Sequence, residues 1–574
     1  MDNLAIARIL TEIGDLLEIK GDNPFKIRAY RNAAETVSQE TRRVDALSDA
    51  ERRALSGIGK DIAAKIGELV ETGAIAYHQN LVQAFPPTVL DLLQLQGVGP
   101  KTVALLYREL NIRTLAELEA AAKTGRLRDV RGMGGRKEAS ILKALEGQRR
   151  VTGRRLASEG FATAAGLVSA LAEHAPLARI SLVGSLRRGC ETCGDIDILA
   201  AGAPTDLMQA FSTSSLVERI LVHGETKSSV VLSGGFQADL RLVPADSHGA
   251  ALQYFTGSKA HNIALRERAI ARGFKLNEYG LFGLDDDTRV AGEDEVRLYE
   301  ALGLAWIPPE LREDRGEIQA AEAGSLPRLI EPADLRGDLH SHTTATDGRA
   351  DLETMAHAAQ AAGLRYLAIT DHSQSLAMAN GLDEARALEH ARRIRSLNDR
   401  LEGITLLAGI ECDIRADGSM DLASDCLAQL DIVVASIHSG HTQGAEQMTE
   451  RLLRAIECPW VDVLGHPTGR LILRREPVAA DWPRVIRAAI DAGVALEING
   501  QADRRDLNEA LAREARQAGA SFVVSSDAHS PAALGQLRWG TMVARRAWLT
   551  TDAVLNTTGV DELRRRLRRA RRSS

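Results

Sequence analysis

Asp195 and Asp197 stand two residues apart in a predicted β-strand. Residues two apart on a strand point to the same side, so the two carboxylates project from one face and can share divalent cations. Hard oxygen ligands suit Mg²⁺, which proteins bind through a few carboxylates together with substrate phosphates. Just upstream, Ser185, Arg188 and the backbone around Gly194 offer hydroxyl, guanidinium and N–H donors. These residues predict a site for a nucleoside triphosphate and its metal ions.

A third carboxylate, Asp239, lies in an apolar stretch whose alternate residues point the other way. Burying an ionised carboxylate there costs folding free energy unless it faces a cation. We therefore expect Asp239 to complete a triad with Asp195 and Asp197. Two metals held by such a triad can activate a hydroxyl nucleophile and stabilise the attacking and leaving oxygens. The strands expected around this site are 179–183, 196–200, 217–222, 229–232 and 237–243.

A second group of candidate ligands follows a change of pattern near residue 336. Strand-like runs alternate there with helical stretches, at 366–370, 404–410, 432–436, 461–464, 495–499 and 521–525. That βα repetition predicts a parallel sheet and a barrel, whose active site lies at the C-terminal ends of the strands. Histidines and carboxylates recur at or just past those ends: His340, His342, Asp347, Asp371, His372, Glu411, His438, His466, Asp527 and His529. Imidazole with carboxylate suits Mn²⁺, Zn²⁺ or Fe²⁺.

Three glycine-rich turns, each before a predicted helix, lie within the first 150 residues. Two of them have an apolar residue inside Gly-x-Gly, and a third, looser copy spans 130–137. Glycine permits the tight turn, and N–H groups at the start of the next helix can bind a DNA phosphate without reading sequence. The residues expected to contact DNA in this way are Gly57, Gly59, Gly97, Gly99 and Lys101.

The size and composition of the chain exclude several classes. Its 574 residues are too many for one core, so three or more domains are expected. Five cysteines do not make a disulfide framework and no apolar run spans a bilayer, so we expect a cytoplasmic protein with no membrane partner. The net charge is −7, but residues 81–150 carry twelve Lys and Arg against seven Asp and Glu. No oligomerisation seam is apparent, and a monomer is expected.

The central region resembles the family X DNA polymerases. Gly-Ser-Leu-Arg-Arg-Gly at 184–189 with the following Asp-x-Asp is similar to their nucleotidyltransferase signature, and 254–266 and 273–280 resemble their thumb. The resemblance implies deoxynucleoside triphosphate binding with two Mg²⁺ or Mn²⁺ ions at the triad. It places Arg241 beside the triad and Arg266 on the template strand. It implies nucleotide-binding roles for Ser185, Arg188, Gly194, Tyr254, Phe255, Gly257, Lys259 and Asn262.

The C-terminal part resembles the polymerase-and-histidinol-phosphatase (PHP) domain. His-x-His, Asp-Gly, Thr-Asp-His, Gly-Ile-Glu, Ser-Ile-His-Ser, Gly-His-Pro and Ser-Asp-Ala-His occur in that order. The nine ligand positions of that family are filled by His340, His342, Asp347, His372, Glu411, His438, His466, Asp527 and His529. The resemblance implies about three bound ions that activate water against a phosphoester. Because all nine positions are filled, we expect a working phosphoesterase.

Lys65 has two interpretations. Some family X members use a lysine Schiff base for deoxyribose-phosphate lyase chemistry, and Lys65 stands at that position with Tyr30 near it. Such a nucleophile needs desolvation or nearby cations to lower its pKa. Lys60 is close, but Asp61 stands where the family often has a basic residue. Lys65 is therefore expected either to be catalytic or to contact a phosphate.

The fold expected is multidomain: helical helix–hairpin–helix N-terminal domains, an α+β nucleotidyltransferase palm with a thumb, and a C-terminal α/β PHP barrel. The expected division is a lyase-like domain 1–80, fingers 81–150, palm 151–245, thumb 246–315, linker 316–335 and PHP domain 336–574.

The resemblance covers essentially the whole chain and implies a DNA-directed DNA polymerase. It would fill short gaps in gapped or nicked duplex DNA during base-excision repair. The C-terminal domain would add a 3′→5′ exonuclease, with AP-endonuclease or 3′-phosphodiesterase activity as a further expectation. Two enzymatic alternatives stay open. One is mainly a 3′-end-processing nuclease with weak synthesis, which Lys259 and the Cys190/Cys193 turn leave possible. The other is a DNA-binding protein with a small-molecule phosphatase domain.

Overall fold

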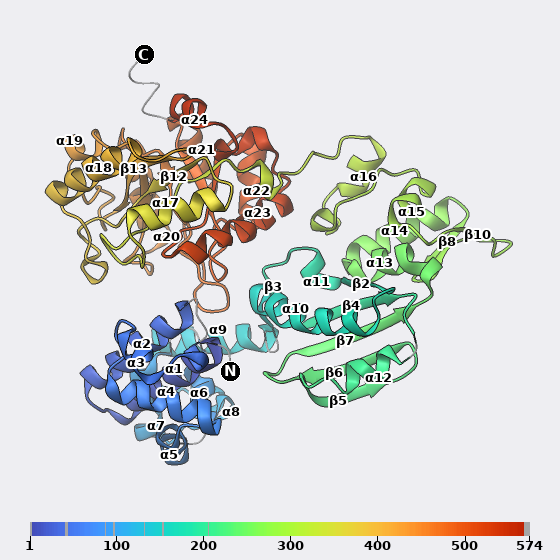
Figure 1. Ribbon diagram of the computed structural model, residues 1–574, viewed down its shortest axis with the longest axis horizontal. Helices are drawn as coiled ribbons and strands as arrows, with labels where there is room; N and C mark the ends of the chain where they lie inside the picture. The colour runs from blue at the N-terminus through green and yellow to red at the C-terminus, as the bar shows by residue number, and fades with distance from the viewer. Residues whose placement is uncertain are drawn as a thin grey trace. The chain divides into compact units, whose positions relative to one another are not determined.

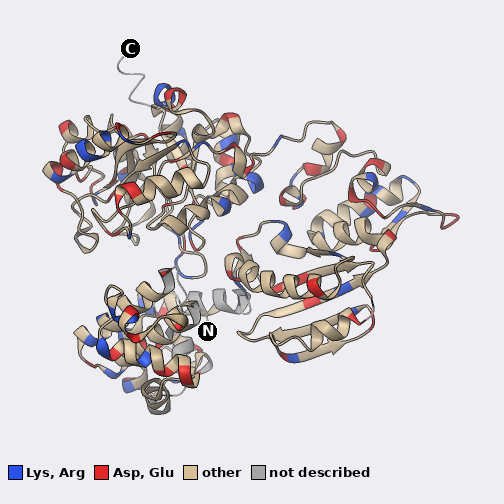
Figure 2. Ribbon diagram, viewed as in Figure 1, with Lys and Arg blue, Asp and Glu red and all other residues tan. Residues whose placement is uncertain are grey.

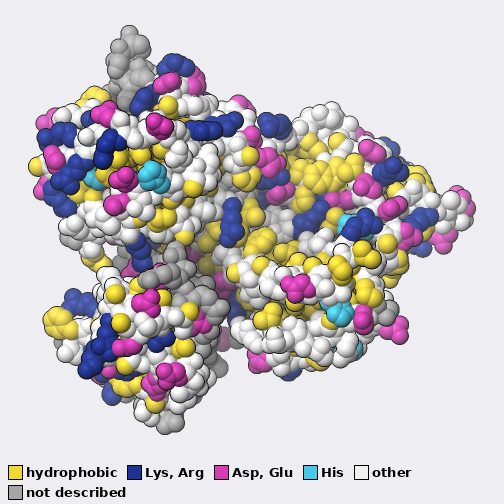
Figure 3. Space-filling view, viewed as in Figure 1, with side chains coloured by type: hydrophobic (Ala, Val, Ile, Leu, Met, Phe, Trp, Pro, Cys, Tyr) yellow, Lys and Arg dark blue, Asp and Glu magenta, His cyan; other side chains and the backbone are white. Residues whose placement is uncertain are grey.

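The computed structural model describes residues 3–40, 44–85, 88–93, 95, 98–130, 132–151, 154–204 and 206–567. The chain divides into two compact units, Met1–Thr152 and Gly153–Ser574 (Figure 1). Among the described residues, no helix combines the length and the apolar character that crossing a bilayer requires. Lys and Arg are interspersed with Asp and Glu along the helices of both units (Figure 2), and the face in Figure 3 carries both charges.

The described part of the first unit is helical. Its helices are α1 (Asn3–Lys20), α2 (Pro24–Gln39), α3 (Asp49–Ala54), α4 (Lys60–Thr72), α5 (Ala76–Ala84), α6 (Thr88–Leu93), α7 (Pro100–Leu110), α8 (Leu115–Lys123) and α9 (Gly134–Val151). Helix α2 starts after a break in the chain, because Asn23 caps it with its side chain and Pro24 takes the first helical position. One face of α1 is apolar and buried, with Leu10 and Ile13 fully inaccessible.

The second unit begins with a five-stranded sheet in the order β2-β4-β7-β6-β5, in which only the β4–β7 pair is parallel. Its elements are β1 (Arg155–Leu156), α10 (Ala157–His174), β2 (Arg179–Leu182), α11 (Gly184–Arg187), β3 (Thr192–Cys193), β4 (Asp195–Ala201), α12 (Leu207–Ser212), β5 (Val217–His223), β6 (Lys227–Leu232) and β7 (Gln237–Val243). Helices α10 and α12 share a core with one face of the sheet. All five strands predicted from the sequence are present.

Helices and a small antiparallel sheet follow. They comprise α13 (His248–Thr256), α14 (Lys259–Ala271), β8 (Phe274–Asn277), β9 (Gly280–Gly283), β10 (Arg289–Ala291), α15 (Glu295–Ala301) and α16 (Glu317–Glu322). The start of α13 packs on the second face of the five-stranded sheet, through Ala251 against Leu199 and Val243. Within 316–335, expected to be a linker, α16 buries Ile318 and Ala321 against the core of this region.

The last part of the chain is a seven-stranded parallel sheet in sequential order from β11 to β17. Its strands are β11 (Gly337–Asp338), β12 (Tyr366–Ile369), β13 (Thr405–Asp413), β14 (Ile432–Ser436), β15 (Val463–Leu464), β16 (Ala495–Asn499) and β17 (Phe522–Ser525). The helices around them are α17 (Leu352–Ala361), α18 (Glu384–Asn398), α19 (Ser424–Leu427), α20 (Ala445–Glu457), α21 (Trp482–Ala492), α22 (Glu509–Ala518), α23 (Leu537–Arg546) and α24 (Val560–Arg566). The predicted barrel is confirmed, although the sequence indicated six of its strands and missed β11.

Alternating side chains build two cores around this sheet. Tyr366 and Ala368 point into the barrel, while Leu367 and Ile369 pack outward under the helices. Leu563 of α24 joins the inner group, so the C-terminal helix covers the N-terminal end of the barrel. The opposite end carries the histidines and carboxylates.

The side chain of Asn556 joins the first and last strands, β11 and β17. Its amide donates to the carbonyls of Gly337 and Val524 at 2.7 Å each, and its oxygen accepts from the Val524 N–H at 3.0 Å. A parallel bridge between Ser341 and Ala528 continues the seam beyond the strands. The barrel is thus nearly closed by one buried amide, which satisfies backbone groups that would otherwise be exposed edges.

Asn556→Leu should lower the stability of the second unit by about 3 kcal/mol, because it leaves three buried backbone groups without a partner. Urea unfolding followed by circular dichroism would show this as a lower midpoint for the transition of that unit. An unchanged midpoint would mean that the seam does not depend on Asn556.

Candidate active sites

Three carboxylates share one face of the five-stranded sheet. Ile196 and Ile198 of β4 are buried in the core beneath α10, so alternation places Asp195 and Asp197 on the opposite face. Asp239 stands directly beside Asp197 in the parallel β4–β7 pair. The structure therefore places the predicted triad on one face of the sheet, the face that α13 covers.

Burial and the charges of Asp195 and Asp239 raise the pKa of Asp197 to about 7. A cation bound beside Asp197 would offset this repulsion and favour its ionised form. Hard carboxylate oxygens with this unmet negative charge fit Mg²⁺ or Mn²⁺. Asp239 has partners of its own, since Gln237 donates to it at 2.9 Å and the Lys227 ammonium lies 3.5 Å away.

Gly184, at the start of α11, is the point of closest approach to the triad. It has φ +63°, and a β-carbon added to it would lie 2.2 Å from Oδ2 of Asp197. Only glycine accepts both that backbone conformation and that contact. Glycine at position 184 is therefore needed for the position of Asp197.

Gly184→Ala should reduce primer extension by about 10²-fold, because the added methyl group displaces Asp197 by an ångström or more. Gly273→Ala is the matched control. Gly273 has φ +78°, but no described atom lies within 4 Å of the position that its β-carbon would take, so this change adds backbone strain alone. Equal steady-state rates for the two variants would contradict a steric role for Gly184.

A cavity of about 540 Å³ opens beside Asp195 and Asp197. Its walls contain nine further residues named from the sequence: Gly184, Ser185, Arg188, Tyr254, Phe255, Gly257, Lys259, Asn262 and Arg266. Thr256 lines the same cavity. Gly194 and Asp239 are not among the described residues that line it. Figure 1 places the elements involved, α11, β4, α13 and α14, in one region of the second unit.

Several of these side chains are already fixed within the protein. Asn262 donates to the carbonyl of Tyr254 at 2.7 Å and accepts from Gln253 at 2.7 Å. Arg241 lies over the ring of Phe255, 5.2 Å from its centroid. Arg154 also lines the cavity and donates to the carbonyl of Thr192 at 2.6 Å. Sequence reasoning missed Arg154, since a single arginine before a two-residue strand gives no signal.

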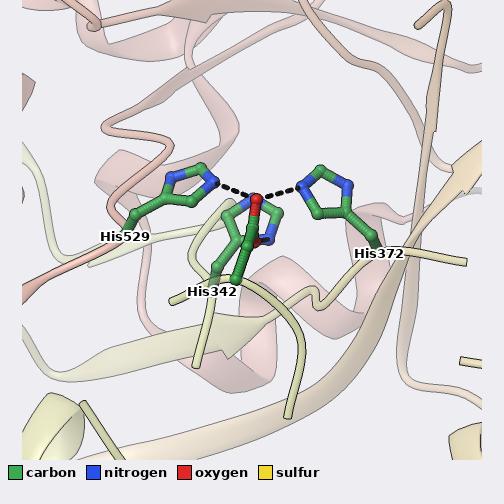
Figure 4. A group of neighbouring side chains, drawn as sticks. His342, His372 and His529 are labelled. Atoms are coloured by element: carbon green, nitrogen blue, oxygen red, sulfur yellow. Dashed lines mark ion pairs between the residues drawn. The ribbon is translucent and has the colours of Figure 1, made fainter. Parts of the chain in front are cut away.

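The second group of side chains converges at the C-terminal end of the barrel. All nine predicted ligands fall into four overlapping sets, within each of which one ligand atom per residue lies within 4.8 Å of the others. Figure 4 shows His342, His372 and His529 turned toward one another. The carboxylate of Asp347 lies between the last two, 3.4 Å from His372 Nε2 and 3.5 Å from His529 Nε2.

Glu411, near the end of β13, is at the centre of the cluster and is 1% exposed. Its Oε1 lies 2.8 Å from His466 Nε2 and 3.2 Å from His438 Nε2. Its Oε2 lies 2.8 Å from His372 Nδ1 and 3.4 Å from His340 Nε2. Four segments of the barrel thus place imidazoles around one carboxylate.

The hydrogen bonding of this cluster is incomplete in a way that suits metal ions. His372 Nδ1 and Glu411 Oε2 are 2.8 Å apart, yet neither has a hydrogen-bond partner among the described residues, and the same holds for the buried nitrogens His340 Nε2, His342 Nδ1 and His466 Nδ1. Burial and the neighbouring His529 and His372 lower the pKa of His342 to about 4, so its ring is neutral. The neighbouring carboxylates instead raise the pKa of His372 to about 10 and that of His438 to about 9, and a bound cation would replace the proton on such rings. Imidazoles beside carboxylates are the donor set of Mn²⁺, Zn²⁺ or Fe²⁺.

Acidic side chains outside the predicted set orient two of the histidines. Glu497 of β16 accepts from His340 Nδ1 at 2.8 Å, and its other oxygen accepts from the backbone N–H of His466 at 2.6 Å. Asp413 pairs with His438 Nδ1 in the same manner. Such outer carboxylates fix the ring and its tautomer. Strand alternation could have indicated Glu497, because an acid inside a buried apolar strand needs a partner.

The helix–hairpin–helix residues of the first unit lie where the pattern predicts. Gly57 has φ +75° in the turn before α4, and Gly59 and Gly99 are the N-caps of α4 and α7. Lys101 is exposed on the first turn of α7, and Gly97 lies outside the described residues. Lys65 is mostly buried on α4, where its ammonium pairs with Asp61 and lies 5.2 Å from the centre of the Tyr77 ring.

Four family models match the chain. They are the helix-hairpin-helix domain over residues 1–75, the SAM-like helix-hairpin-helix tandem over 89–146, the DNA polymerase beta thumb over 251–313 and the PHP domain over 338–501. The matches occur in the order predicted from the sequence.

The chain is 35% identical to the DNA polymerase/3′-5′ exonuclease PolX of Bacillus subtilis (strain 168) over 567 residues, which cover 98% of this chain and 99% of that protein. It is also 30% identical over 231 residues to a probable phosphatase of Thermoanaerobacter sp. (strain X514), covering 38% of this chain and 89% of that protein. A probable phosphatase of Shewanella sp. (strain MR-4) is 31% identical over 229 residues, with 38% and 86% covered. The full-length match, the thumb and the metal-ligand barrel together show that this chain belongs to the family X DNA polymerases with a C-terminal PHP domain.

Proposed function

We propose that this protein is a DNA-directed DNA polymerase that fills short gaps in duplex DNA, and that its PHP domain is a metal-dependent 3′→5′ exonuclease. The observation that carries the first part is the cavity beside the carboxylate triad. The observation that carries the second is the convergence of nine histidine and acidic ligands. The relative in Bacillus subtilis, whose name contains both activities, supports the pairing.

At the first site, Asp195, Asp197 and Asp239 would hold two Mg²⁺ or Mn²⁺ ions. Bound there, the ions lower the pKa of a primer 3′-hydroxyl and neutralise charge on the triphosphate. Ser185 and Arg188 line the same cavity and would bind the phosphates through a hydroxyl and a guanidinium.

Tyr254 and Phe255, at the end of α13, line the same cavity and would contact the sugar of the incoming nucleotide. Lys259 and Asn262 at the start of α14 would contact the nucleotide, and Arg266, one turn further, would contact the template strand. Gly257 joins the two helices at φ +72°. A β-carbon added to it would lie 3.1 Å from the Arg188 guanidinium, so a larger residue would push against the side chain proposed to bind the phosphates.

At the second site, the nine ligands would hold about three ions, which supply an activated nucleophile for phosphoester hydrolysis. Glu497 and Asp413 would keep the rings of His340 and His438 in the orientation that ligation needs. The same site would also cleave the strand beside an abasic site or remove a 3′ blocking group, since each of these reactions hydrolyses a phosphoester.

The DNA substrate would be held by its backbone. Helix starts at Gly59 and Gly99 present N–H groups, and Lys101 adds a charge. Affinity for a gapped, 5′-phosphorylated duplex should therefore be independent of sequence and fall with salt. Because base-excision repair produces such short gaps, a polymerase with this substrate would act in that repair.

Lys65 is proposed as a lyase nucleophile, because it is largely buried and close to Tyr77. Borohydride should trap the wild-type protein on a nicked abasic duplex, and Lys65→Ala should abolish the trapped complex. Lys60→Ala, which removes a neighbouring exposed ammonium of the same helix, should retain it. Equal trapping by Lys65→Ala would instead assign Lys65 to phosphate contact.

A second candidate for the PHP domain is hydrolysis of small phosphomonoesters, which the two probable phosphatases favour. One experiment distinguishes the candidates: extension and degradation of a gapped duplex, and phosphate release from histidinol phosphate, each with Mg²⁺, Mn²⁺ and Zn²⁺. The proposal predicts nucleotide addition and 3′ shortening. Phosphate release alone, with an unchanged duplex, would overturn it.

A further inference from the structure

Helix α23 links the PHP barrel to the turn of the palm at residues 188–191, which includes the proposed phosphate-binding Arg188. At Gly540 it packs so closely on the barrel that an added β-carbon would lie 2.8 Å from Val524 of β17 and 3.1 Å from the Ile498 carbonyl of β16. Two residues further along, Met542 lies against Gly189 of the palm. The helix therefore cannot shift on the barrel without moving against the turn that follows Arg188.

Arg546, the last residue of α23, is 5% exposed and has three partners. It donates to the backbone carbonyl of Arg188 at 2.7 Å, to Glu313 Oε1 at 3.0 Å and to Glu509 Oε1 at 2.7 Å. One planar guanidinium thus joins the PHP helix α22, the end of the thumb and the palm turn. Bonds between charged groups are the stronger kind, and buried ones are costly to break.

Glu313 connects Arg546 to Arg188, which lines the nucleotide cavity. The same oxygen that accepts from Arg546 also accepts from Arg188 Nε at 3.0 Å. Nη1 of the Arg188 guanidinium donates to the carbonyl of Thr256. The Arg188 side chain also lines the 540 Å³ cavity. The position of the phosphate-binding guanidinium therefore depends on a carboxylate shared with the PHP domain.

Two further arginines of the PHP domain hold the same turn at a distance from Arg188. Arg470 binds Glu191 through both nitrogens, at 3.2 Å and 2.6 Å, and Arg505 donates to the carbonyl of Cys190 at 3.1 Å. Both therefore support the turn, but of these three described arginines only Arg546 reaches Arg188 and its carboxylate partner.

We infer that Arg546 is a positioning residue for the polymerase site: through Glu313 and the Arg188 carbonyl, the PHP domain holds Arg188 where it binds the triphosphate of the incoming nucleotide. The inference rests on the proposed nucleotide site of the palm. It predicts that a residue of the nuclease domain sets nucleotide affinity without touching either reaction centre.

Arg545 provides a matched control on the same helix. It donates to Glu310 at 2.7 Å and to the carbonyl of Ile330 at 2.9 Å, so it also ties α23 to the segment before the barrel. These partners belong neither to the turn nor to the Arg188–Glu313 pair. Arg545→Ala therefore removes a comparable ion pair of α23 without changing the surroundings of Arg188.

The test uses the full-length protein with Mg²⁺ and measures dATP binding by calorimetry without DNA, alongside single-nucleotide insertion and 3′→5′ degradation. Arg546→Ala should raise both the Kd and the KM for dATP by about tenfold, the loss expected for one misplaced charge-assisted contact. The kcat should change little, because Arg188 binds the phosphates in the ground state as well as in the transition state. Arg545→Ala should keep the wild-type Kd and KM, and both variants should degrade DNA at the wild-type rate.

Arg546→Lys, which keeps the charge but not the three-way fork, should fall between wild type and Arg546→Ala. Glu313→Gln should raise the KM in the same way, and it decides the question if Arg546→Ala does not fold. Wild-type Kd and KM in the folded Arg546 and Glu313 variants would overturn the inference, as would an equal rise in Arg545→Ala.

If wild type binds dATP but does not extend a primer, the proposed polymerase function fails while the binding comparison still tests Arg546. If wild type neither binds nor extends, both proposals fail.

Discussion

Asp197→Asn is expected to abolish templated synthesis, with single-nucleotide insertion reduced by at least about 10³-fold, because a lost metal ligand removes several kcal/mol of transition-state stabilisation. Asp197 is the member of the triad whose pKa is raised to about 7 by burial and by the other two carboxylates. A bound cation would therefore favour the ionised form of Asp197. The amide keeps the shape of the side chain but cannot supply that charge. Degradation of the same primer should continue at the wild-type rate.

Asp206→Asn makes the same chemical change at an exposed carboxylate of the palm, 3.4 Å from His174 and outside the described residues that line the cavity. It should leave insertion unchanged. Gel analysis of a gapped, 5′-phosphorylated duplex measures both activities in one assay. Residual insertion above about a tenth of wild type in Asp197→Asn would be incompatible with catalysis by the triad.

Glu411→Gln is expected to have the opposite effect: loss of 3′→5′ degradation by at least about 10³-fold, with insertion retained. Four imidazole nitrogens lie within 3.4 Å of the two oxygens of this carboxylate. The nearby histidines hold its pKa well below the ordinary value despite complete burial. Removing the negative charge at this position should expel ions from more than one of the four ligand sets.

Glu450→Gln, at an exposed carboxylate of α20 that pairs with Arg484, is the matched control and should have wild-type nuclease activity. The substitution at Glu411 does not alter Arg546, so nucleotide affinity should also be retained. Loss of both activities in either Asp197→Asn or Glu411→Gln would argue against two independent sites.

Much of this fold could be predicted from periodicity and spacing. The palm strands and six barrel strands form where their sequences indicate, and the Gly-x-Gly turns begin helices α4 and α7. The candidate ligands could be named from the sequence because carboxylates and imidazoles that recur at strand ends have few purely structural explanations. In the structure the side chains of His340 and His342 are wholly inaccessible, and the ligand roles of the nine residues stay a prediction.

Other features had no local signal. Strand β11 has two residues, Gly337 and Asp338, too few for any periodicity to be visible. Asn556 closes the barrel from a segment 219 positions later in the chain than Gly337. The contact between Arg546 and the Arg188 carbonyl spans 358 positions. Such long-range pairings depend on the finished fold, so a single sequence does not indicate them.

The central claim is that one chain holds two separate groups of cation-binding side chains. Anomalous diffraction from crystals of the full-length protein grown with Mn²⁺ and a non-hydrolysable deoxynucleotide tests it most directly. The account predicts one group of anomalous peaks at Asp195, Asp197 and Asp239, and a second group among the nine PHP ligands around Glu411. Mn²⁺ peaks missing from either place, or found only elsewhere on the protein, would contradict it.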